Sequence, residues 1–298
     1  MTPKVSVIVA TYKRENELRL ALESLAKQTY SNYEIVVVND NADSYWDEKV
    51  DNIVNDFRIS HSDVEVIYIK NEVNQGSAKT RNIGIERANG EYITFLDDDD
   101  IYLENKITNQ VDFMIEKNLD YSITDLFLYN EKDKLIDKRI RKYIKGYSKD
   151  ILFACHLKHN LTGTDSMMFK KVYLNKIGGF APINIGDEFY LMQRAIEGDG
   201  TFGYLPVCDI KAYVHTGDGG LSSGQGKIDG ENKIYEHKKK YFNKLSRKDV
   251  RFIKMRHYAV LAFAYFRMKK YFSTIKFLLM SMLASPFSFV KLIFKKER

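Results

Sequence analysis

Short apolar runs of strand length alternate with helical periodicity through the first hundred residues, and this alternation constrains the fold more than any other feature. Strands are expected at Val5–Ala10, Glu34–Asn39, Val64–Ile69 and Tyr92–Leu96. Helices are expected between them, the third at Ser77–Ala88. Because strands separated by helices of this length pair through right-handed crossovers, they form a parallel sheet that is covered on both faces. We therefore predict an α/β fold with a Rossmann-like, mostly parallel sheet and helices on both faces.

The middle third of the chain has a less regular pattern. Short helices are expected after Ser148 and after Asp187. Further strands are expected at Tyr121–Tyr129, Ser166–Lys170, Tyr204–Val207 and Ala212–His215. The Gly-rich stretch Gly217–Gly226 is expected to be a flexible loop that could close over a substrate, and helical spacing resumes beyond Glu231.

Charge is distributed unevenly along the 298 residues. The formal net charge is +6, yet residues 231–298 hold 18 Lys and Arg against 4 Asp and Glu, and the remainder holds 28 basic and 36 acidic residues. A change of this size in net charge along the chain indicates a domain boundary. We predict a catalytic domain at residues 1–225 and a basic, helical C-terminal extension at residues 226–298.

Composition favours a globular, intracellular protein. Cys155 and Cys208 are too few for a disulfide framework, and the N-terminus does not have the pattern of a signal peptide. No uninterrupted apolar stretch reaches the length of about 18 residues typical of a membrane-spanning helix. We therefore expect a cytoplasmic location.

Polar residues follow the predicted strands at the edge of the sheet where ligands of such folds collect. A carboxylate such as Asp40 can accept the imide hydrogen of uracil, and Tyr12 can cover the face of the base. At the start of the third helix, Lys79 and Arg81 could meet phosphates. These residue types together suit a nucleotide.

Four consecutive carboxylates, Asp97–Asp100, follow the fourth predicted strand. They repel one another, and a hard divalent cation would relieve that repulsion, since Mg²⁺ or Mn²⁺ binds one or two carboxylates together with phosphate oxygens. Such an ion would neutralise charge on a departing diphosphate. An acidic helix N-terminus is the structural alternative for the run alone.

Four segments in this order carry a resemblance to a known family: Val5–Arg14, Glu34–Asp40, Asn74–Gly84 and Gly90–Asp100. Together they resemble the inverting glycosyltransferases of family 2, of bacterial type, over about residues 3–220. The resemblance implies a GT-A fold, in which a Rossmann-like nucleotide half is fused to an acceptor half. It also implies transfer of a sugar, a hexose, from a UDP-sugar donor to a hydroxyl of a glycan or glycoprotein acceptor.

The resemblance also implies roles for individual residues. Asp99 is the implied direct metal ligand, with Mn²⁺ or Mg²⁺ as the cofactor. The implied donor-binding residues are Thr11, Tyr12, Arg14 and Asp40 for the nucleoside, Arg81 near the nucleotide, and Asp97 and Asp98 in the DXD motif. The chain departs from the family at residues 39–42, which read Asn-Asp-Asn-Ala instead of Asp-Asp-Gly-Ser, so only the second acid is kept.

An inverting transferase needs a general base that deprotonates the acceptor hydroxyl. Glu188 lies at the family's base position, and the adjacent Asp187 is the alternative, because the usual Glu-Asp pair is exchanged here. His215 precedes the Gly-rich loop, and imidazole there would suit Mn²⁺ as a second ligand. The structural alternatives are that Asp187 and Glu188 are only acids at the N-terminus of a helix, and that His215 has only a structural role.

The basic extension allows several partners. We favour a helical hairpin that packs on the catalytic domain or forms a homo-oligomer contact, over peripheral binding at the inner membrane face. No nucleic-acid motif accompanies the basic charge, so nucleic acid is not expected as a partner. The competing functions are a catalytically silent nucleotide-sugar binding module and a nucleotidyltransferase. The latter would need a Gly-rich loop after the first strand, and Thr11–Glu15 does not supply one.

Overall fold

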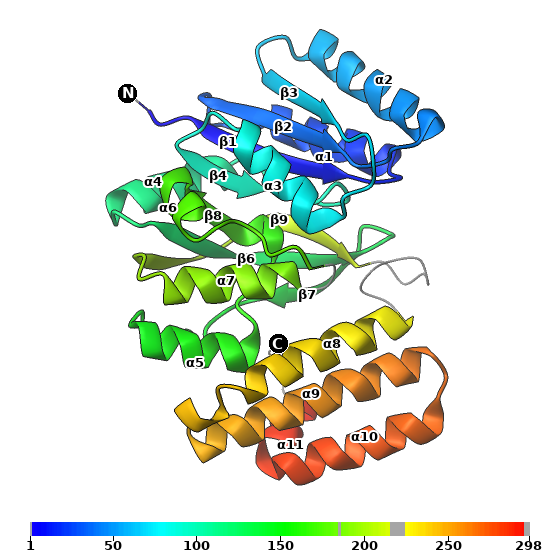
Figure 1. Cartoon of the computed structure of the whole chain (residues 1–298), viewed down its shortest axis with the longest axis vertical. Coiled ribbons are helices and arrows are strands. Elements are labelled where there is room, and N and C mark those ends of the chain that lie inside the picture. Colours follow the sequence, from blue (N-terminus) through cyan, green and yellow to red (C-terminus); the bar gives the residue numbers. More distant parts are fainter. Residues whose placement is uncertain (1, 184–185, 215–223, 295–298) are drawn as a thin grey trace. The chain divides into compact units, whose positions relative to one another are not determined.

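The computed structural model describes residues 2–183, 186–214 and 224–294 of the chain (Figure 1). They form two compact units, and each is described by itself. The sheet unit lies within Met1–Lys149 and Thr162–Val214, and the helical unit lies within Asp150–Leu161 and His215–Arg298. Most of the helix that follows Ser148 therefore belongs to the same unit as the C-terminal helices. The functional boundary at residue 225 stays a prediction.

The sheet unit alternates strands and helices in its first half, as the sequence predicts. Its strands are β1 (Val5–Thr11), β2 (Tyr33–Asn39), β3 (Glu65–Lys70), β4 (Tyr92–Phe95), β5 (Ile101–Tyr102), β6 (Tyr121–Asn130), β7 (Leu135–Arg139), β8 (Met167–Lys170) and β9 (Phe202–Val214). Its helices are α1 (Asn16–Ala26), α2 (Ser44–Ser60), α3 (Ser77–Arg87), α4 (Lys106–Glu116), α6 (Lys171–Lys176) and α7 (Asp187–Glu197), with a 3₁₀ turn at Thr164–Ser166.

These nine strands, counted over the described residues, form one sheet in the order β3-β2-β1-β4-β8-β6-β9-β5, with β7 paired to β6. The first four strands of this order are parallel, whereas β8 is antiparallel to both β4 and β6. The predicted α/β fold is confirmed, and the sheet is mixed beyond β4. The carboxyl ends of β2, β1 and β4 meet at one edge, which is where the predicted ligand residues lie.

Alternate residues of the parallel strands pack on opposite faces of the sheet, because successive side chains of a strand point to opposite sides. Val7 and Val9 belong to one apolar cluster with Leu18 and Leu22 of α1. On the other face, α3 approaches so closely that a Cβ on Gly84 would lie 2.5 Å from the Ile8 side chain. A residue without a side chain at this position lets the helix lie against the sheet.

Two strands that the sequence predicts separately belong to one continuous strand, β9. Tyr204–Val207 and Ala212–His215 were expected separately, but β9 runs without a break from Phe202 to Val214. Its parallel pairing with β6 changes register where Pro206 and Val207 stand, since Leu205 pairs with Thr124 and Cys208 with Asp125. Proline has no N–H to donate, which explains an irregularity inside the strand. The local sequence pattern does not predict β5 or β7.

The helical unit contains α5 (Lys149–His159), α8 (Gly224–Lys239), a 3₁₀ turn at Phe242–Lys244, α9 (Arg247–Arg267), α10 (Tyr271–Ala284) and α11 (Pro286–Phe294). The Ser246 hydroxyl caps α9 by accepting a bond from the Asp249 N–H at 3.1 Å. Helices α9 and α10 form a hairpin around Leu261, Ala264 and Phe277. Since α8 begins at Gly224, the last residues of the predicted loop are helical. None of the described helices combines the length and apolarity that crossing a membrane requires.

Candidate functional site

The loops that follow β1 and β4 are joined by direct bonds at the sheet edge. The Tyr12 N–H donates to Asp98 Oδ2 at 3.2 Å, and Arg14 Nη2 lies 2.8 Å from Asp99 Oδ2. The turn after β1 passes through Lys13 with a φ of 53°, and the Lys13 N–H donates to Asn41 Oδ1 at 2.7 Å. Three segments far apart in the sequence therefore meet here, because their strands are neighbours.

Asp40 is buried and organises the loop that leads into α3. Its Oδ1 accepts bonds from Asn71 Nδ2 at 2.7 Å and from the Gln75 N–H at 2.8 Å, and its Oδ2 accepts the Gly76 N–H at 2.9 Å. The carboxylate thus has a structural task, and its predicted role toward uracil stays a prediction. Tyr12, the predicted cover of the base, has a half-exposed ring. Asn71 is a part of this site that the sequence motifs did not indicate.

An acidic cluster forms from Asp97, Asp100 and Asp165, whose carboxylate oxygens lie within 4.8 Å of one another. Asp165 was not predicted. It stands just before β8, and the antiparallel pairing of Thr94 with Met168 brings it opposite Asp97. The contact is direct, since Asp165 Oδ1 accepts the Asp97 N–H at 2.7 Å. Only strand pairing could reveal this third acid, because nothing in the local sequence around it marks a site.

The pKa values of three acids at this edge, Asp98, Asp100 and Asp165, are raised. Burial, with the neighbouring Asp99 charge, raises the pKa of Asp98 to about 7. Burial, with the Asp97 charge, raises the pKa of Asp165 to about 7, and burial next to Asp165 also raises the pKa of Asp100. Carboxyl groups crowded in a desolvated place resist ionisation together. A cation that reached them would be bound by the ionised forms.

Arg81 connects this cluster to a second pair of acids at the start of α7. Its Nη2 lies 2.6 Å from Asp97 Oδ1, and its Nη1 lies 2.9 Å from Asp187 Oδ2. The guanidinium also stands 5.4 Å from the centre of the Phe180 ring. The loop before α7 is attached to α3 as well, because Asn82 exchanges two hydrogen bonds with the Phe180 backbone, at 2.9 and 2.8 Å.

Asp187 and Glu188 form a pair with unequal surroundings. Asp187 is buried and faces Arg81, whereas Glu188 is half-buried. Burial and the adjacent Asp187 carboxylate raise the pKa of Glu188 from 4.5 to about 8. Glu188 therefore retains a proton near neutral pH. A carboxyl group with this pKa can accept a proton from a hydroxyl more readily than an ordinary glutamate.

Seven predicted site residues are thus joined by direct contacts at one end of the sheet: Tyr12, Arg14, Arg81, Asp97, Asp98, Asp99 and Asp187. Glu188 adjoins Asp187, Thr11 ends β1 next to this group, and Asp40 holds the neighbouring loop. Asp99 contacts Arg14 and is not among the three acids of the cluster. His215 lies outside the described residues.

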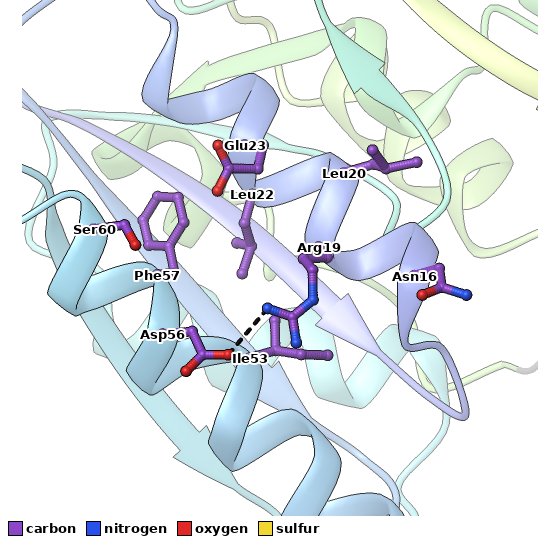
Figure 2. Close-up of a pocket in the computed structure, with 9 residues that line it drawn as sticks. All are labelled: Asn16, Arg19, Leu20, Leu22, Glu23, Ile53, Asp56, Phe57 and Ser60. Atoms are coloured by element: carbon purple, nitrogen blue, oxygen red, sulfur yellow. Dashed lines mark hydrogen bonds and ion pairs between the residues drawn. The ribbon is translucent and has the colours of Figure 1, made fainter.

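A separate cavity of about 320 Å³ opens between α1 and α2 (Figure 2). Arg19 and Asp56 form an ion pair across it at 3.1 Å, and Leu22, Ile53 and Phe57 line its apolar part. None of the predicted donor-binding or catalytic residues is among its lining residues. The convergence of charged groups, rather than the presence of a cavity, marks the candidate site.

Comparison with known proteins supports the family resemblance. A family model described as Glycosyl transferase family 2 matches residues 6–175. An uncharacterized glycosyltransferase of Methanocaldococcus jannaschii is 30% identical over 224 residues, which cover 74% of each chain. The Escherichia coli enzyme named UDP-Glc:alpha-D-GlcNAc-diphosphoundecaprenol beta-1,3-glucosyltransferase WfaP is 36% identical over 133 residues, 44% of this chain and 49% of that protein.

Several relatives are much longer than the matched region. The chain spans about a fifth of the length of three uncharacterized Rickettsia glycosyltransferases and about half of WfaP. Among solved structures, Staphylococcus aureus TarS 1–349 in complex with UDP-GlcNAc superposes with a TM-score of 0.61 at 18% identity. That match covers 94% of this chain and 91% of TarS 1–349. The predicted GT-A-like fold is thereby confirmed.

Proposed function

Since the chain belongs to glycosyl transferase family 2, we propose that it transfers a sugar from a UDP-sugar to a hydroxyl group of a glycan or glycoprotein, with inversion at the anomeric carbon. The observation that carries the proposal is the Arg81 bridge. Arg81 holds two acidic groups close together. One is the acidic cluster, which is suited to a diphosphate-bound cation, and the other is the pair of Asp187 and Glu188, which is suited to proton transfer. The names of WfaP and of the TarS complex, which include UDP-sugars, support this donor class.

The acidic groups fit a divalent cation. Three carboxylates with oxygens within 4.8 Å offer hard oxygen ligands. The pKa values of Asp100 and Asp165 are raised by burial and by neighbouring carboxylates, and Mg²⁺ or Mn²⁺ would relieve the repulsion between these groups. Asp97, Asp100 and Asp165 would hold the ion, and Asp99 would join them by giving up Arg14. When bound, the ion supplies Lewis-acid stabilisation of the departing diphosphate. His215 stays a predicted second type of ligand.

The residues at the carboxyl edge of the sheet would bind the donor. Thr11, Tyr12, Arg14 and Asp40 would hold the nucleoside. Asp98, next to the Tyr12 backbone, would face the ribose. Arg81 would compensate negative charge between the diphosphate and the acid pair.

The pair of Asp187 and Glu188 would carry out the proton transfer. Glu188, as a carboxylate, would accept the proton of the acceptor hydroxyl while that oxygen forms a bond to the anomeric carbon. The bond from this carbon to the β-phosphate oxygen breaks at the same time, and its electron pair leaves with UDP. Asp187, held by Arg81, would keep Glu188 in position and raise its proton affinity. In the alternative assignment, Asp187 itself is the base.

Substitution of the base tests the proposal. A panel of UDP-sugars and acceptor glycans should reveal transfer by the wild type, and Glu188→Gln should lower kcat by about 10²–10⁴ while UDP binding by calorimetry is kept. Glu197→Gln, on the exposed end of the same helix, is the matched control and should leave kcat unchanged. If Asp187→Asn is inactive while Glu188→Gln stays active, the base is Asp187.

A second outcome separates the enzyme from a binding module. UDP binding by the wild type without turnover on any donor or acceptor of the panel would favour a catalytically silent protein and contradict sugar transfer.

A further inference from the structure

Helix α10 in the helical unit has large apolar side chains on its exposed side, whereas its buried residues are polar and Phe277 packs against α9. Its two buried residues are Thr274 and Ser281. The Ser281 hydroxyl donates to the Met255 carbonyl of α9 at 2.8 Å, so a polar contact joins the two helices. On the opposite side, Phe272 is 86% exposed and Leu283 is 73% exposed. A helix in a soluble core has the reverse arrangement.

The exposed apolar residues of α10 form a continuous stripe. Besides Phe272 and Leu283, it contains Tyr271, Ile275, Leu278, Leu279 and Met282, which recur at intervals of three and four residues. Helix α11, which follows α10 after Ser285, adds Phe287, Val290 and Ile293 as exposed apolar side chains, and none of its described side chains is buried. We call these exposed side chains of α10 and α11 the apolar stripe. Small polar residues between helices and large apolar residues outside are typical of helices that contact lipid.

The segment that contains the apolar stripe carries charges of one sign. From residue 250 to residue 294 the sequence contains eight Lys and Arg and no Asp or Glu. Lys270 directly precedes α10, and Lys276 and Lys291 lie within α10 and α11; all three are exposed. Lysines that flank an apolar helix face attract anionic lipid headgroups while the apolar residues enter the acyl boundary. The charge pattern is thus complementary to an anionic bilayer surface.

We propose that the apolar stripe binds the surface of an anionic membrane. The dimensions suit a helix that lies in the interface, because the 14 residues of α10 extend about 21 Å, less than the roughly 30 Å of a hydrocarbon core. A second copy of the chain is the competing occupant. Pairing two stripes would bring two sets of lysines together, and residues 250–294 contain no acidic residue to compensate their charge. Repulsion between the lysines therefore disfavours a dimer formed through the stripe.

Flotation of the full chain with lipid vesicles tests the proposal. The wild type should float with phosphatidylcholine vesicles that contain phosphatidylglycerol, far less with pure phosphatidylcholine, and less as salt screens the lysines. The double variant Phe272→Ser/Leu283→Ser should lower the partition coefficient about tenfold or more. The matched control Ile59→Ser/Val172→Ser replaces two side chains of the sheet unit that are each 81% exposed, and it should bind as the wild type does.

The charge contribution is tested separately. Lys276→Gln and Lys291→Gln should each weaken binding to the anionic vesicles about fivefold, and their folding is checked by circular dichroism. The proposal fails if the wild type does not float, or if the control pair loses as much binding as the stripe pair. It also fails if the stripe pair only converts a dimer into a monomer in sedimentation while vesicle binding is unchanged.

Discussion

Replacing Glu188 by glutamine should make the sheet unit more stable at alkaline pH. In the folded chain, burial and Asp187 raise the pKa of Glu188 from 4.5 to about 8, so the folded state keeps a proton that the unfolded state loses. Unfolding therefore releases a proton between these two pKa values, and wild-type stability falls as the pH rises through that window. Glutamine cannot ionise and removes this dependence.

The expected magnitude follows from proton linkage. One pKa unit corresponds to about 1.4 kcal/mol, and integration between about pH 5 and pH 8 gives a loss on the order of 3 kcal/mol from Glu188 in the wild type. The free energy of unfolding of Glu188→Gln relative to wild type should therefore increase by that amount across the same range. Below about pH 4 the two proteins should differ little, because Glu188 is then largely protonated in both states.

Urea denaturation at a series of pH values measures this difference. Trp46 in α2 is the single tryptophan of the chain, so its fluorescence reports on the sheet unit. The measurements are made with a chelator and without donor, and Glu197→Gln serves as the exposed control on the same helix. Stability curves of wild type and Glu188→Gln that run parallel from about pH 5 to pH 8 would refute the argument, because burial would then not raise this pKa.

Four further substitutions, one of them a control, test the candidate site and the sheet that supports it. Asp165→Asn removes one carboxylate of the acidic cluster. In thermal melts, Mn²⁺ at about 100 times the wild-type Kd should stabilise the wild type by about 2.7 kcal/mol and the variant by much less. Equal stabilisation of the two proteins would contradict the cation site. Arg81→Gln leaves two carboxylates without their shared cation and should cost about 3–5 kcal/mol in urea denaturation. Arg19→Gln, which breaks an exposed pair, should cost less than about 1 kcal/mol, and similar losses for both would count against the Arg81 bridge. Gly90→Ala would place a Cβ 2.5 Å from the Ser6 backbone nitrogen and should lower stability by about 2 kcal/mol, which an unchanged urea midpoint would disprove.

Local sequence was sufficient for the elements that carry the nucleotide half. The β-branched runs that became β1, β2 and β4 bury nearly all of their side chains, and the periodic stretches became α1, α2 and α3. The acids after β4 could also be placed at the sheet edge, because the carboxyl ends of neighbouring parallel strands meet there. These features depend on residues close together in the chain.

Pairing between distant segments decided the rest. Asp165 joins Asp97 through the antiparallel register of β8 on β4, and no pattern around Asp165 indicates it. Arg81 was expected to face a nucleotide, and it also binds Asp187, which lies 106 positions further along the chain. The continuity of β9 through Pro206 likewise depends on its partner β6.

By itself, the sequence determined which segments form the parallel strands and helices and which acids and bases follow them, because hydrophobic periodicity and turn residues act over a few neighbours. Only the tertiary structure decided that three acids share one place, that Arg81 links them to Asp187, and that burial raises the pKa of Glu188. Burial and charge proximity belong to the assembled fold, since they depend on atoms supplied by strands and helices far apart in the chain.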